Sequence, residues 1–68
     1  MPHLVSQREV EILGLIKEGR TTAHIANSLG LSPYTVKNHV QNILRKLGAR
    51  TRSHAVAQAM NMGLLSNV

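Results

Sequence analysis

Residues 21–47, TTAHIANSLGLSPYTVKNHVQNILRKL, decide how this chain folds. They predict a short helix over about Thr22–Leu29, a glycine turn, and a longer helix over about Pro33–Leu47. Ser32 is a good N-cap, and the proline after it stands at the first helical position, where its missing N–H costs nothing. The pattern therefore predicts a helix-turn-helix, a motif whose second helix enters the major groove of DNA.

The longer helix has one apolar and one polar face. Its apolar side chains recur at helical spacing and predict a buried stripe of Val36, Val40, Ile43, Leu44 and Leu47. The other side chains point largely away from the core, namely Tyr34, Thr35, Lys37, Asn38, Gln41, Asn42 and Arg45. Hydroxyls, amides and cations of this kind suit the edges of bases and the phosphates between them.

Two further helices flank this segment. Ser6 and Glu9 form the S-x-x-E pattern of a capping box, which predicts a first helix over about 7–18. Thr51 caps a last helix over about 52–62, which ends at a glycine. No segment has the alternation of a strand, so we expect an all-α, four-helix fold.

The composition allows one domain, residues 1–68, because a chain this short removes only about 60% of its unfolded surface from water. There is no cysteine and no apolar run near the ~20 residues of a membrane span, so the cytoplasm is the expected location. No two histidines stand three or four residues apart, and no Asp or glycine-rich phosphate loop is present. We therefore expect no metal, no cofactor and no enzymatic activity.

Charge is distributed unevenly along the chain. The first 18 residues hold all three acids and a net charge of −1, whereas the remaining 50 hold six cations, no acid, and a charge of +6 before histidines are counted. A surface of one sign favours a polyanionic partner such as nucleic acid. The alternative explanation is a charge excess that only keeps the protein in solution.

Taken together, four stretches resemble the LuxR-type (GerE/NarL/FixJ) DNA-binding domain: LVSQREVEIL at 4–13, IA at 25–26, SPYTVKNHV at 32–40 and RKLGARTRSHAV at 45–56. The resemblance covers nearly the whole chain. It implies a four-helix domain of a bacterial transcription regulator that binds double-stranded DNA as a dimer. Such domains are commonly the output portion of a response regulator or a ligand-sensing protein. His24 departs from the pattern, because many relatives carry a glutamate there that closes a capping box.

Lys37, Asn38 and Gln41 are the candidates for reading bases. They lie on the exposed face in the first half of the longer helix. Lysine can donate to guanine O6 and N7, and the two amides match the N6 and N7 atoms of adenine. In similar proteins the matching positions reach base edges, although the residues at two of them vary, so the preferred DNA sequence does not carry over.

Contacts to the DNA backbone are expected from hydroxyls, cations and helix N-termini. The candidates are Thr21, Thr22, Tyr34, Thr35, Asn42, Arg45 and Lys46. Thr35 could instead bond locally within its own helix. Lys46 could instead pair with Glu9 or Glu11, and for Arg52 an ion pair with a glutamate of the first helix is at least as strong an expectation as a DNA contact.

The last helix is the candidate dimer surface. Ala55, Val56 and Ala59 form its expected inner line, which leaves the small or flexible residues Ala57, Met60 and Asn61 outside. RNA polymerase is a further candidate partner. Two other functions stay open, a sigma-factor region-four domain and a protein-interaction module that uses the surface of the third or fourth helix.

Overall fold

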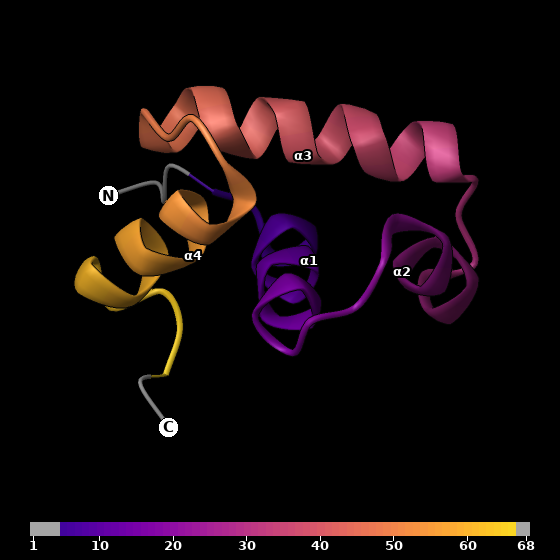
Figure 1. Cartoon of the computed structure of the whole chain (residues 1–68), viewed down its shortest axis with the longest axis horizontal. Coiled ribbons are helices and arrows are strands. Elements are labelled where there is room, and N and C mark those ends of the chain that lie inside the picture. Colours follow the sequence, from indigo (N-terminus) through magenta and orange to yellow (C-terminus); the bar gives the residue numbers. More distant parts are fainter. Residues whose placement is uncertain (1–4, 67–68) are drawn as a thin grey trace.

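The computed structural model describes residues 5–66, and within them it contains four helices and no strand. These are α1 (Gln7–Lys17), α2 (Thr22–Leu29), α3 (Pro33–Leu47) and α4 (Arg52–Asn61). Figure 1 shows α3 as the longest helix, with α2, α1 and α4 all lying on one side of it. α1 packs against α3 and α4, while α2 packs against α3. The all-α, four-helix prediction is confirmed.

Each helix begins at the hydroxyl residue that its sequence predicts. Ser6, Thr21, Ser32 and Thr51 each accept a hydrogen bond from the backbone N–H three residues later. In α1 the capping box is complete, because the Glu9 side chain also accepts from the backbone N–H of Ser6 at 2.8 Å. The bounds of α2 and α3 match the prediction. α1 and α4 each end one residue early, because Glu18 and Met62 serve as C-caps.

Left-handed glycines end the two helices of the central motif. Gly30 and Gly48 have φ values of 68° and 63°, a conformation in which a Cβ would be strained. After Gly30 the chain turns sharply, and the N–H of Leu31 donates back to the Ala26 carbonyl at 2.8 Å. This turn sets the direction in which α3 leaves α2.

The core is aliphatic and is shared by all four helices. Its largest inaccessible side chains are Ile12, Leu13, Ile25, Ile43 and Val36. Each such side chain stabilises the fold by about 1.5–3 kcal/mol through removal from water. Leu44 and Val56 are only partly buried, although their spacing placed them on the inner faces. α3 is therefore held along the line through Val36, Val40, Ile43 and Leu47, and its opposite face is left to solvent.

One ion pair joins the start of α1 to the end of α3. The Lys46 Nζ donates to both carboxylate oxygens of Glu9, at 2.8 and 3.0 Å, and the Glu9 side chain is only 5% exposed. Burial alone raises the pKa of the Glu9 carboxyl, but the hydrogen bonds from Lys46 and from the Ser6 backbone outweigh it and hold the pKa below its usual value. This pair fixes where the second half of α3 lies relative to the core.

Candidate nucleic-acid interface

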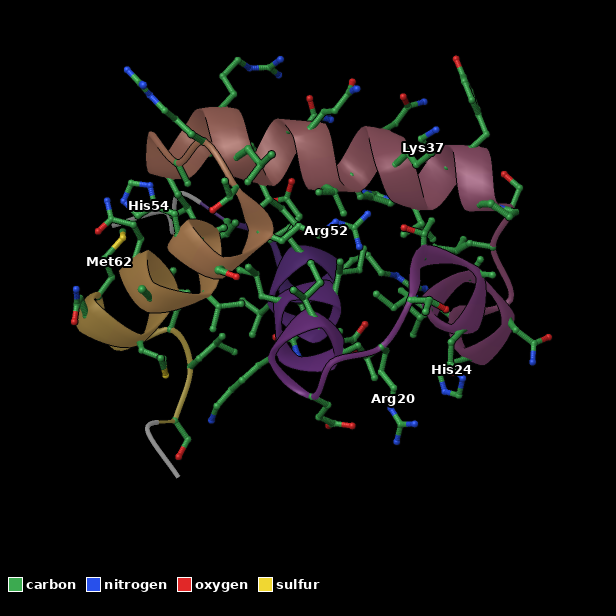
Figure 2. The ribbon with its side chains drawn as sticks, in the orientation of Figure 1. Arg20, His24, Lys37, Arg52, His54 and Met62 are labelled. Carbon is green, nitrogen blue, oxygen red and sulfur yellow. The ribbon has the colours of Figure 1, made fainter. Side chains whose placement is uncertain are left out.

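The outer face of α3 carries the three side chains expected to read bases. Lys37, Asn38 and Gln41 are all exposed, and none of them takes part in a hydrogen bond or ion pair within residues 5–66. Figure 2 shows Lys37 in the first half of α3, above α2 in that view. Because these side chains have no internal partner, their donors and acceptors are available to an external one.

The residues around these three are partly engaged within α3. The Thr35 hydroxyl lies 2.9 Å from the Ser32 hydroxyl, which is the local bond that the sequence left open. Arg45 donates to the Asn42 side-chain oxygen at 2.6 Å, which leaves the amide N–H₂ of Asn42 without an acceptor within residues 5–66. Tyr34 is 74% exposed at the beginning of the helix.

The N-terminus of α2 is the second group of polar residues. Thr21 accepts from the backbone N–H of His24 at 3.1 Å and so acts as the cap. The Thr22 hydroxyl oxygen accepts from the guanidinium of Arg52 at 2.6 Å. The expected ion pair between Arg52 and a glutamate of the first helix is wrong, because within residues 5–66 Arg52 bonds to Thr22 and forms no ion pair. Arg52 stands at the first turn of α4, where it reaches α2 rather than α1.

Lys46 forms an ion pair with Glu9, which was the alternative to a phosphate contact in the sequence analysis. Two of the three donors of its ammonium group go to Glu9. Its side chain is 35% exposed, so the third donor faces solvent near the end of α3. A phosphate contact by Lys46 would therefore add to the ion pair with Glu9 and would not require it to break.

The ion pairs leave a positive surface over α3. The three acids are each paired with a cation, as Arg8–Glu11, Arg20–Glu18 and Lys46–Glu9. Lys37, Arg45 and Arg50 have no carboxylate partner within residues 5–66. The uncompensated charge thus lies on and just after α3, which is the helix that also presents the free amides.

The outer side of α4 carries the three candidate dimer residues. Ala57 and Asn61 are exposed and Met60 is half-buried. Sequence reasoning missed Met62, which it placed inside the helix but which caps it and is 50% exposed. Figure 2 shows Met62 and His54 at the end of the molecule farthest from α2. An apolar side chain at this exposure enlarges the surface that a second copy could cover.

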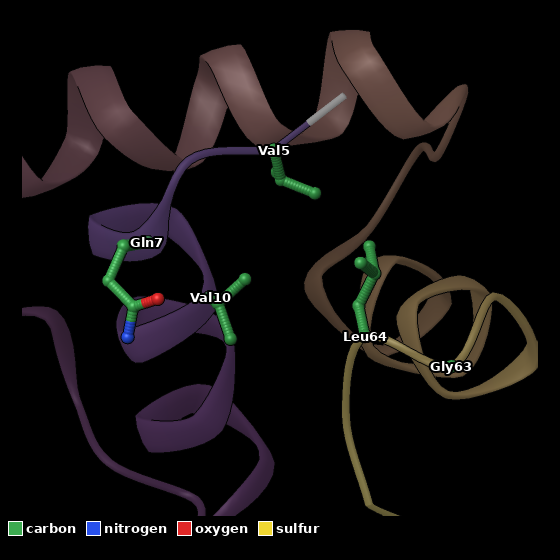
Figure 3. Close-up of a pocket in the computed structure, with 5 residues that line it drawn as sticks. All are labelled: Val5, Gln7, Val10, Gly63 and Leu64. Atoms are coloured by element: carbon green, nitrogen blue, oxygen red, sulfur yellow. The ribbon is translucent and has the colours of Figure 1, made fainter. Parts of the chain in front are cut away.

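A hollow between the start of α1 and the chain after α4 offers no comparable chemistry. It has a volume of about 270 Å³, with Val5, Gln7 and Val10 on one side and Gly63 and Leu64 on the other (Figure 3). Among the described residues that line it, Gln7 has the only polar side chain, and none of them carries a charge. Within the described residues no three potential ligands gather around a metal position, and no helix is long and apolar enough to cross a membrane.

Comparisons with known proteins agree with this arrangement. The sequence profile described as "Bacterial regulatory proteins, luxR family" matches residues 3–59. The spore germination protein GerE of Bacillus subtilis is 42% identical over 62 residues, which are 91% of this chain and 84% of GerE.

Solved structures give the same result. The structure of the transcription factor GerE superimposes with a TM-score of 0.90 at 37% identity, covering 96% of this chain and 97% of that one. The response regulator ChrA of a heme-sensing two-component system matches with a TM-score of 0.87 at 35% identity, but this chain spans only 33% of it. These matches favour the LuxR-type interpretation over a sigma-factor region-four domain. The chain belongs to the luxR family of bacterial regulatory proteins and is a helix-turn-helix DNA-binding domain of that family.

Proposed function

We propose that this chain regulates transcription by binding a specific double-stranded DNA sequence with α3 in the major groove. The observation that carries the proposal is the outer face of α3, where Lys37, Asn38 and Gln41 are exposed and without partners while the opposite face is buried. A helix of this diameter fits the major groove, and side chains in its first half reach deepest. GerE, which is similar along nearly its whole length, is a transcription factor.

Base reading follows from the donors and acceptors of these side chains. The Lys37 ammonium can donate to O6 and N7 of guanine, and Asn38 and Gln41 can each pair with N6 and N7 of adenine. Because none of the three is engaged elsewhere, binding needs no internal hydrogen bond to break.

Backbone contacts would come from both ends of the motif and set the register of α3. The candidates are Thr21, Thr22, Tyr34, Thr35, Asn42, Arg45 and Lys46. Arg45 keeps donors beyond the one that bonds Asn42, and Lys46 keeps one beyond its pair with Glu9. Either hydroxyl can donate in the bond between Ser32 and Thr35, and when Ser32 donates, the O–H of Thr35 is available to a phosphate. These contacts carry affinity but no direct sequence information.

A dimer on a (pseudo)palindromic site is the second part of the proposal. Ala57, Met60 and Asn61, with the exposed Met62 beside them, give α4 a surface with few charges on which two copies can approach closely. A domain this small buries little area in such a contact, so we expect a weak dimer in solution and cooperative binding on DNA. Half-sites should be about one helical turn apart. RNA polymerase is a further candidate partner, and a longer regulator would use this chain as its output domain.

The experiment is selection of bound duplexes from random DNA, followed by affinity measurements at rising salt. We expect an enriched inverted repeat. If each protomer of a dimer neutralises about three phosphates, the binding constant should fall with roughly the fifth power of salt concentration. Enrichment of no sequence, or an affinity that does not depend on salt, would favour the protein-interaction module instead.

A further inference from the structure

The hydrogen bond between Arg52 and Thr22 joins two helices that are distant in sequence. Arg52 is the first residue of α4 and Thr22 the first residue of α2, yet the guanidinium Nη2 donates to the threonine Oγ1 at 2.6 Å. In Figure 2 Arg52 lies beneath α3, between α4 and α2. Both residues are half-buried, so the bond is partly shielded from water.

The placement of this arginine is electrostatically unusual. The N-terminus of a helix carries partial positive charge and disfavours a cation within its first turn. Arg52 lies in the first turn of α4 and against the first residue of α2, and no carboxylate pairs with it within residues 5–66. A guanidinium beside the positive N-terminus of α2 becomes favourable when an anion approaches the same place.

The bond also determines how the Thr22 hydroxyl can act. A hydroxyl has one hydrogen and two acceptor lone pairs, and one lone pair is occupied by Arg52. The hydrogen has no acceptor within residues 5–66, and it must point away from the guanidinium. Thr21 likewise accepts one bond, from the N–H of His24, and keeps its own O–H, but Thr22 is the hydroxyl at this helix end whose bond comes from a different helix.

We infer that Arg52 is a positioning residue for DNA binding, acting through Thr22. By donating to Oγ1 it holds the Thr22 side chain so that its O–H donates to a phosphate oxygen at the start of α2. The inference rests on the proposed function and deepens it. Because Arg52 acts on a backbone contact, its loss should weaken binding to all sequences by the same factor.

The experiment is a double-mutant cycle on DNA affinity with Thr22→Val, Arg52→Gln and both together. Valine keeps the shape of threonine and removes its hydroxyl, while glutamine removes the guanidinium. Each single variant should lose about tenfold in DNA affinity, because a hydrogen bond to a charged phosphate is lost or weakened. The loss should be the same on matched and mismatched duplexes. The double variant should lose little more than the weaker-binding single one, because the two residues serve one contact. Thr22→Ser keeps the hydroxyl and should bind more tightly than Thr22→Val.

A matched control separates positioning from charge. Arg50→Gln is the same substitution at an exposed arginine two residues earlier that has no bond to Thr22. Its effect should add to that of Thr22→Val. Affinities are measured well below the melting temperature of each variant, so that a purely structural role of Arg52 would leave them unchanged.

The possible results fall into distinct classes. Additive losses for Thr22→Val and Arg52→Gln, or no loss for either, would overturn the inference while leaving DNA binding by the wild type intact. A wild type that binds no duplex in a salt-dependent way would overturn the proposed function itself.

Discussion

Replacing Lys46 by methionine should destabilise the domain, and the effect should depend on pH. Methionine keeps most of the aliphatic stem of lysine but leaves the Glu9 carboxylate, which is 5% exposed, without the two hydrogen bonds at 2.8 and 3.0 Å. Removing one partner of a fully buried pair costs about 3–5 kcal/mol. The Lys46 side chain is 35% exposed, so water screens the pair and we expect about 1–3 kcal/mol. For a domain of this size that lowers the melting temperature by roughly 5–20 °C.

The pH dependence follows from the pKa of Glu9. Because the folded-state pKa is lowered from 4.5, the ionised carboxylate contributes stability above that value, and the contribution is lost as pH falls through the lowered folded pKa. In Lys46→Met the burial that raises the pKa of Glu9 persists, the bonds and the charge of Lys46 that lower it are gone, and only the bonds with Ser6 still lower it. The difference in melting temperature between wild type and variant should therefore be full at pH 7 and should close as pH falls through the lowered pKa of Glu9 in the wild type.

The assay is thermal unfolding followed by circular dichroism from pH 7 to pH 3, with Lys37→Met as the matched control. Lys37 is exposed and unpaired, so the same substitution there should change the free energy of unfolding by less than about 0.5 kcal/mol. If Lys46→Met has the same melting temperature as Lys37→Met at pH 7, then the ion pair does not stabilise the fold as argued. The same holds if the melting temperature of Lys46→Met lies below that of the wild type by the same amount at every pH.

Three further predictions concern glycines, a cap and the dimer. Gly14 lies inside α1 with open space where a Cβ would be added, so Gly14→Ala should raise the free energy of unfolding by about 0.5–1 kcal/mol. Gly48 has a φ of 63°, so Gly48→Ala should lower the free energy of unfolding by about 1–2 kcal/mol. Denaturant titration measures both changes, and equal shifts would contradict the backbone argument. His24→Glu should complete a capping box on Thr21 and add about 0.3–1 kcal/mol at pH 7, so an unchanged or lower melting temperature would mean that His24 makes a contact of its own. Met60→Glu puts a charge on the proposed dimer surface and should abolish cooperative binding to a duplex with two half-sites. Sedimentation of the complex with this duplex measures it, and cooperative binding of two copies by the variant would exclude α4 as the dimer surface.

The helix bounds could be predicted from sequence because they depend on neighbours in the chain. A hydroxyl residue bonds the N–H three positions later, so Thr21 and Ser32 mark where α2 and α3 begin. Glycines that take a left-handed conformation mark where the same helices end. Both signals are local, and both agree with the apolar spacing of Val36, Val40 and Ile43.

The contacts between helix ends could not be predicted in the same way. Periodicity shows which face of a helix is buried but not which end of another helix lies beside it. From the sequence, Lys46 had three possible partners, namely Glu9, Glu11 and a DNA phosphate. The packing of α1 on α3 brings it to Glu9. For Arg52 the sequence left open an ion pair with an acid of the first helix and a DNA contact, and the position of α4 instead brought it to Thr22, 30 residues away. That bond carries the further inference, and no sequence signal indicated it.

Affinity of two variants for matched and mismatched duplexes tests most directly whether the outer face of α3 reads bases. Lys37→Ala should cost about 1–3 kcal/mol on the preferred site and should flatten the preference at one base pair, because it removes a donor to a base edge. Arg45 is exposed on α3 and is a candidate for a phosphate contact. Arg45→Ala should therefore weaken binding to all duplexes nearly equally, and it should reduce the slope of log affinity against log salt concentration by about one. A uniform loss for Lys37→Ala, with the preference at every base pair intact, would contradict the assignment of this face to sequence readout.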